Sequence, residues 1–154
     1  MTYTCYYKCV IFYCLIGINK NNEKNKILSN YIMNEVQREM VIGFYKWQLV
    51  LKSFHFMTKY VVRHEASDRY LKSFTEKYDK FVEVCMGHHD QVELGEFNIH
   101  ITIINDNNIF DHIKEFQQVL LTLKSAYVEY SDLINILDEM ESDLHQFVYL
   151  LRLQ

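Results

Sequence analysis

A chain of 154 residues is long enough for one domain with a sizeable buried core, and short for two. Proline is absent and glycine occurs four times, so little interrupts the chain and long helices are expected. The formal net charge of -4 argues against binding to nucleic acid through overall positive charge, and we do not expect DNA binding.

Residues 1–28 differ from the rest and are predicted to be an extension outside the core. They hold Cys5, Cys9 and Cys14, whose spacing matches neither a metal knuckle nor an established disulfide pattern, so we expect a reduced, cytoplasmic setting. The apolar run 10–18 is too short to span a membrane, and we do not expect membrane association. A gene start at Met33, a packed segment and a loose membrane contact are the alternatives for this region. The polar run 19–26 is typical of a linker.

Residues 29–154 carry the helical signal. The first predicted helix runs from Ser29, as N-cap, to Lys59, because apolar residues recur at steps of three and four. The second runs from Arg63 to Met86 and is ended by Gly87. The stripe of the first helix comprises Val36, Met40, Phe44, Trp47, Leu51 and Phe54.

Residues 88–107 break the helical pattern. Their "FNIHITII" alternates and is rich in β-branched residues, which predicts a short strand or an extended segment. A third helix is predicted over 108–130, and a fourth begins at a Ser131 cap. Four amphipathic helices predict an all-α fold, an antiparallel four-helix bundle with the extended segment as its longer crossover.

The second helix carries an ionisable strip opposite its apolar face. With 100 degrees per residue, His64, Asp68, Asp79 and Glu83 fall within about 100 degrees of one another. The same strip also carries apolar residues, which is typical of a surface covered by another subunit. Those on the strip are Leu71 and Val82, with Thr75 between them; the opposite face carries Ala66, Tyr70, Phe74, Phe81 and Cys85.

The two acidic ends of this strip are too far apart to share one ion within one chain. Asp68 and Asp79 are separated by about 16 Å along the axis, whereas ligands lie about 2–2.5 Å from their metal. A two-fold axis near Phe74 would bring His64 and Asp68 of one chain beside Asp79 and Glu83 of the other, twice. We therefore expect a homodimer through the 63–86 helix, with a metal site of the kind that suits iron, Mn2+ or Zn2+.

The string "FHFMTKYVVRHEASDRY…DKFVE" resembles the metal site of the Dps-like mini-ferritins of the ferritin-like superfamily. His64, Asp68, Asp79 and Glu83 match that pattern at intervals of four, eleven and four, and His55 stands where the family has its first histidine. The resemblance implies a ferritin-like bundle that oxidises Fe(II) at an intersubunit site as a ferroxidase. It also implies a dodecameric cage that stores ferric iron and protects against oxidative stress.

The wider string, with "FVEVCMG" and "ILDEMESDLHQFVYLLRL", is similar to an uncharacterised ferritin-like family of phages and large DNA viruses. That similarity covers about 33–153 apart from 88–107, and implies a viral protein of the host cytoplasm or the virion. Three features depart from the Dps-like pattern. His55 precedes His64 by nine residues where the family usually has twelve, Phe54 replaces the tryptophan commonly found beside the first histidine, and a lysine-rich DNA-binding tail is missing.

Three alternatives stay open from the sequence. The strip could be a solvated helix face, the chain could be a non-enzymatic viral structural or interaction bundle without iron chemistry, or it could be a DNA-compacting protein. The run "GHHD" at 87–90 and the pair Glu141 and His145 are interpreted as surface features, since adjacent histidines diverge and the larger ferritins space Glu and His by three rather than four.

Overall fold

The computed structural model describes residues 23–89 and 91–153, and all regular secondary structure within them is helical. The helices are α2 (Glu23–Met57), α3 (Val61–His88), α4 (Ile109–Ala126) and α5 (Ser131–Arg152). Helix α2 packs against α3 and α4, and α5 packs against the same two helices, which closes a four-membered ring. The predicted all-α bundle of four helices is therefore confirmed for the described part of the chain.

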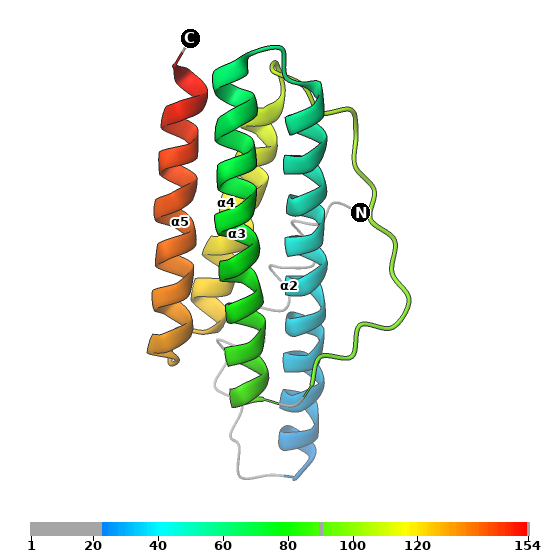
Figure 1. Cartoon of the computed structure of the whole chain (residues 1–154). Helices are drawn as coiled ribbons and strands as arrows, with labels where there is room; N and C mark the ends of the chain where they lie inside the picture. The colour runs from blue at the N-terminus through cyan, green and yellow to red at the C-terminus, as the bar shows by residue number, and fades with distance from the viewer. Residues whose placement is uncertain (1–22, 90, 154) are drawn as a thin grey trace.

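Figure 1 shows how the chain passes through this ring. Helix α2 rises and α3 descends beside it, and the two are joined by a short turn at residues 58–60. The crossover at residues 91–108 then climbs back along the outer side of α2, so that α4 descends and α5 rises. The crossover is thus the only long connection among the described helices, and it lies on the same side of the bundle as α2.

The predicted start of the first helix is wrong. Helix α2 begins at Glu23, so Ser29 lies inside the helix and is not its N-cap, and residues 23–26 of the expected linker are helical. Glutamate and lysine are good helix formers and no proline or glycine lies between 23 and 42, so nothing in the sequence stops the helix near Ser29. The rest of the predicted linker, 19–22, and the extension 1–18 lie outside the described residues.

The other boundaries also differ from expectation. Gly87 lies inside α3, which ends at His88, and the His89 N–H closes the helix on the Cys85 carbonyl at 3.0 Å. Helix α4 ends at Ala126 rather than at 130, and Ser131 is the first residue of α5 rather than its cap. A turn separates the two helices, closed by the Tyr130 N–H on the Tyr127 carbonyl at 2.9 Å.

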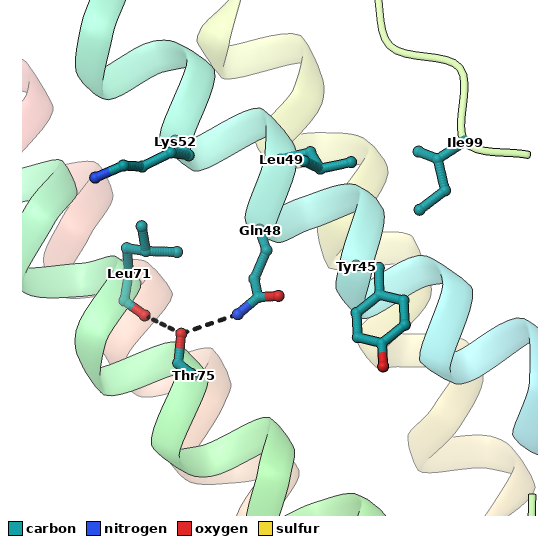
Figure 2. A pocket seen from close by; sticks show the side chains of 7 residues that line it. All are labelled: Tyr45, Gln48, Leu49, Lys52, Leu71, Thr75 and Ile99. Atoms are coloured by element: carbon teal, nitrogen blue, oxygen red, sulfur yellow. Dashed lines mark hydrogen bonds between the residues drawn. The ribbon is translucent and has the colours of Figure 1, made fainter.

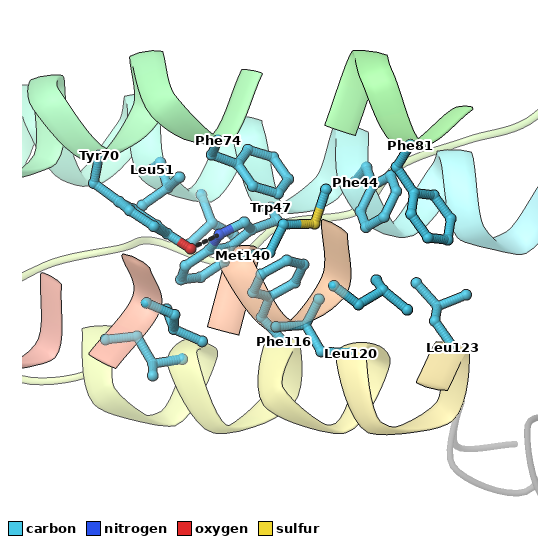
Figure 3. Close-up of a cluster of buried hydrophobic side chains, with 14 of the residues drawn as sticks. Phe44, Trp47, Leu51, Tyr70, Phe74, Phe81, Phe116, Leu120, Leu123 and Met140 are labelled. Atoms are coloured by element: carbon cyan, nitrogen blue, oxygen red, sulfur yellow. Dashed lines mark hydrogen bonds between the residues drawn. The ribbon is translucent and has the colours of Figure 1, made fainter. Parts of the chain in front are cut away.

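The core is built around aromatic side chains from α2, α3 and α4 (Figure 3). Trp47 stacks on Phe116 with ring centroids 4.7 Å apart, and its Nε1–H donates to the Tyr70 hydroxyl at 3.4 Å. Burial raises the pKa of Tyr70 well above its usual range, so this hydroxyl stays protonated. The predicted stripe of α2 and the predicted apolar face of α3 are both buried, which leaves the polar strip of α3 facing outward.

The crossover is extended, and no strand forms in its described residues. Arg38 of α2 holds it by donating to the carbonyls of Leu94 at 2.9 Å and Glu96 at 3.1 Å. Ile104, which is 1 % exposed, anchors its far end in the core. Side chains and the core, rather than a partner strand, therefore fix this segment on the bundle.

Candidate metal centre

The two candidate histidines meet at the α2–α3 turn. His55 lies in the last turn of α2 and His64 in the first turn of α3, and their rings stack with centroids 3.8 Å apart. Each ring reaches the backbone of the other residue. His64 Nδ1 lies 2.8 Å from the His55 carbonyl oxygen, and His55 Nδ1 lies 3.2 Å from the His64 carbonyl oxygen.

These contacts define the tautomer of both rings. A carbonyl oxygen only accepts hydrogen bonds, so each Nδ1 must carry the proton and donate it. In a neutral ring the Nε2 atom then carries the lone pair. A metal-binding histidine commonly has this arrangement, with one ring nitrogen bonded to a carbonyl and the other free for the ion.

A carboxylate from the crossover binds the turn between the two histidines. Asp106 accepts hydrogen bonds from the Thr58 hydroxyl at 2.8 Å, the Lys59 backbone N–H at 3.1 Å and Arg63 Nη1 at 2.9 Å. Partial burial acts to raise the pKa of Asp106, but these hydrogen bonds and the Arg63 charge together lower it below its ordinary value. The crossover thereby fixes the end of α2 relative to the start of α3.

The three candidate carboxylates lie at the surface of the bundle. Asp68, Asp79 and Glu83 are all exposed, and none has a hydrogen bond or ion pair within the described residues. Elsewhere Asp143 pairs with Lys77, and Glu141 pairs with Lys124. The strip therefore presents carboxylates that form no ion pair with any cation in the part of the chain that the structure describes.

The structure brings His55 and His64 together, but it does not bring the three carboxylates to them. No group of three or more His, Cys, Asp or Glu side chains able to hold a metal occurs in the chain at 23–89 and 91–153. The completion of this ligand set by a second copy of the chain stays a prediction from the spacing along α3.

An open apolar groove lies beside the strip (Figure 2). At its centre Gln48 Nε2 donates to the Thr75 hydroxyl at 3.0 Å, which itself donates to the Leu71 carbonyl at 2.8 Å. Leu49 at its edge is 45 % exposed, and Val61 at the start of the strip is 72 % exposed. Tyr45, Lys52 and Ile99 complete the lining of this groove.

Of the other candidate groups, His88 and Glu141 each interact with a residue outside the candidate site. His88, at the opposite end of α3 from His64, lies 2.7 Å from Asp132 of α5, and this hydrogen bond lowers the pKa of Asp132. Asp90 lies outside the described residues. Glu141 pairs with Lys124, and His145 is exposed.

Sequence reasoning missed two residues at the histidine turn. Asp106 could not be assigned to it, because the 47 positions that separate it from Lys59 hide their contact. Ser67 did carry a signal, since it lies next to Ala66 on the buried side of α3 and its side chain is polar. A buried hydroxyl needs hydrogen-bond partners, and those of Ser67 are the His64 carbonyl and the His55 ring.

The fold and the site define a helical bundle with a paired-histidine turn and an unneutralised acidic strip. A family model described as "Family of unknown function (DUF5856)" matches residues 55–151, which is more than half of the chain, and the chain belongs to this family. The matched range begins at His55 and contains all five candidate ligands. No curated protein and no solved structure matches the chain. None of the described helices is long and apolar enough to cross a membrane.

Proposed function

We propose that this protein is a Dps-like, ferritin-like iron-binding protein that oxidises Fe(II) at sites shared between two copies of the chain and sequesters the product. One observation carries the proposal. The strip of α3 has His64 at one end, stacked on His55 of α2 with both Nε2 atoms free, and carboxylates at the other end, and no cation among the described residues pairs with those carboxylates.

Head-to-tail pairing of two α3 helices would place the histidine end of each strip beside the acidic end of the other. Asp79 and Glu83 of one chain would hold the iron together with His64 and His55 of the other, and Asp68 would be an additional or bridging ligand. The exposed Val61 and the groove beside Leu71 supply apolar surface for such an interface. The helix directions in Figure 1, with a long crossover before α4, support the antiparallel ferritin-like arrangement.

The ligand atoms of these side chains are suited to binding and oxidising Fe(II). Imidazole nitrogen with carboxylate oxygen suits Fe(II), and also Mn2+ and Zn2+ as competitors. Carboxylates gathered at an interface repel one another, and a cation removes that repulsion. Oxidation needs open coordination positions for oxygen or peroxide, so the side chains must leave part of the ion accessible. Assembly of such dimers into a dodecameric cage would store the ferric product and limit oxidative damage.

The test is anaerobic loading with Fe(II), followed by air or peroxide. We expect the near-ultraviolet absorbance of ferric products to rise faster than in buffer, and His64→Ala and Asp79→Ala to slow this rise to the buffer rate. Asp111→Ala is the control, because Asp111 is 73 % exposed on α4 and outside the strip. A wild-type rate equal to buffer, with no effect of either variant, would contradict the proposal.

The second candidate is a structural or interaction bundle without iron chemistry. The exposed apolar residues at the α2–α3 turn favour it, since Phe56 is 70 % and Met57 is 53 % exposed. Native mass spectrometry separates the candidates, because it reports the bound metal and the assembly mass together. A gel-shift at low salt tests DNA compaction, and the acidic net charge predicts no retardation.

A further inference from the structure

Ser67 lies under the paired histidines and is fully buried, with 0 % of its surface exposed. Its hydroxyl donates to the His64 carbonyl oxygen at 2.8 Å, one turn back along α3. Ser67 Oγ itself lies 3.3 Å from Nδ1 of His55, across the turn on α2. Ser67 therefore contacts both histidine residues from a buried position on α3.

The hydroxyl has one hydrogen, and that hydrogen is committed to the His64 carbonyl. Toward His55 the Ser67 oxygen can then only accept, so His55 Nδ1 must be the donor. His55 Nδ1 has a second acceptor in the His64 carbonyl at 3.2 Å, so its proton lies between two oxygens that cannot donate to it. This arrangement excludes the tautomer in which Nδ1 carries the lone pair.

We propose that Ser67 is a positioning residue that, together with the His64 carbonyl, fixes the tautomer and ring orientation of His55, so that Nε2 is the nitrogen presented to a metal ion. The identity of that ion as iron rests on the proposed function; the effect on the ring does not. His64 Nδ1 has a short carbonyl contact of 2.8 Å and none with Ser67, whereas His55 Nδ1 shares its proton between Ser67 and a longer carbonyl contact of 3.2 Å, so the effect of Ser67 is specific to His55.

The first measurement concerns the metal-free protein. In alkaline buffer, where imidazole rings are neutral, long-range proton–nitrogen spectra of 15N-histidine-labelled protein report the tautomer of each ring. We expect both rings to carry the proton on Nδ1 in the wild type. In Ser67→Ala, His55 Nδ1 keeps only the 3.2 Å contact with the His64 carbonyl, so the Nε2–H tautomer of His55 should become more populated than in the wild type while His64 stays unchanged. His64 thus serves as an internal reference in the same sample.

The second measurement is the affinity for Zn2+ and for anaerobic Fe(II). Loss of a hydrogen-bond partner to a ligating histidine typically weakens binding about 10–100-fold, and we expect a loss in this range for Ser67→Ala. Ser67→Thr keeps the hydroxyl and should restore both the tautomer and most of the affinity. Ser73→Ala is the matched control, since Ser73 is a hydrogen-bonded serine of α3 whose partner is Asp143 rather than a histidine.

The possible outcomes separate the two proposals. An unchanged His55 tautomer in Ser67→Ala, or equal changes in Ser67→Ala and Ser73→Ala, would overturn the positioning role. A tautomer change confined to His55 supports that role whatever the metal result. If the wild type then binds neither Zn2+ nor Fe(II), the positioning role stands for the ring and the iron function fails.

Discussion

At the level of single residues, Asp106 illustrates how the histidine turn depends on a distant segment. Its carboxylate bonds Thr58 and Lys59 of the turn and Arg63 of α3, one residue before His64. The Arg63 guanidinium also lies over the Tyr60 ring, 4.6 Å from its centroid, so the turn is held from two sides. The stacking of His55 on His64 is therefore a product of the crossover as well as of the turn.

We predict that Asp106→Asn lowers the free energy of unfolding by about 1–2 kcal/mol at neutral pH, because it weakens charge-assisted hydrogen bonds. The folded pKa of Asp106 lies below its ordinary value of 3.8, so its contribution to stability is complete above that value and is lost as the pH falls through the folded pKa. The gap between wild type and variant should thus narrow in acid.

Urea unfolding at neutral pH and again below pH 3.8 measures whether the difference in unfolding free energy between wild type and variant narrows in acid. Asp111→Asn is the control, because Asp111 forms an ion pair with Lys114 on an exposed face and should change little. A gap that widens in acid would show that Asp106 does not act through its charged form.

The candidate site divides into a part that the sequence could predict and a part that it could not. The order of His64, Asp68, Asp79 and Glu83 along one strip follows from the regular geometry of a helix, and the structure leaves these side chains on the outward side of α3. The stacked rings depend instead on turn geometry, Ser67 and Asp106. No periodic pattern encodes such contacts.

At the level of the helices, the apolar faces were predictable and the ends were not. Buried positions repeat with the period of the helix, so α2 and α3 could be read from their stripes. Helix ends depend on single residues, and Ser29 and Gly87 were both assigned as boundaries from residue type alone. The structure places both inside helices, because neighbouring residues continue the helix through them.

The two glycines near the crossover should respond oppositely to alanine. Gly87 lies in α3, and a Cβ added there meets nothing within 4 Å, so Gly87→Ala should stabilise the protein by about 0.5–1 kcal/mol. Gly95 has a φ of 57°, in the left-handed region, so Gly95→Ala should destabilise it by about 1 kcal/mol. Thermal unfolding of the two variants, side by side, measures both signs.

This pair of variants also discriminates between the two interpretations of Gly87. A glycine that ended the helix in a left-handed conformation would lose stability on substitution by alanine, as Gly95 should. Destabilisation by Gly87→Ala comparable to that by Gly95→Ala would therefore restore the boundary expected from the sequence and contradict the longer α3.

At the level of the whole molecule, the acidic strip of α3 is separate from the ion pairs that link the helices. Lys46 pairs with Glu115 between α2 and α4, and Lys77 pairs with Asp143 between α3 and α5, so ion pairs connect neighbouring helices of the ring. Asp68, Asp79 and Glu83 have no such pair among the described residues, and the groove beside them is open. A surface with these features is suited to a symmetric partner.

The proposal that the site is shared between two chains allows a complementation experiment. In a dimer formed from one His64→Ala chain and one Asp79→Ala chain, one site contains both substitutions and the other contains neither. Each variant alone should be inactive, because every site of its homodimer lacks a ligand. After mixing equal amounts through mild unfolding and refolding, half the dimers should be mixed, so about one quarter of the wild-type Fe(II) oxidation should return.

The control for this experiment mixes His64→Ala with Asp68→Ala. Both residues lie at the same end of α3, so head-to-tail pairing places them in the same half of each site. Every mixed dimer then has one substitution in each site, so the mixture should show no more activity than the average of the two variants measured alone. Recovery in this mixture equal to that with Asp79→Ala, or no recovery in either, would mean that the ligands do not converge across the proposed two-fold axis. Recovery only with Asp79→Ala requires that histidine and carboxylate come from different chains, which a site within one chain cannot produce.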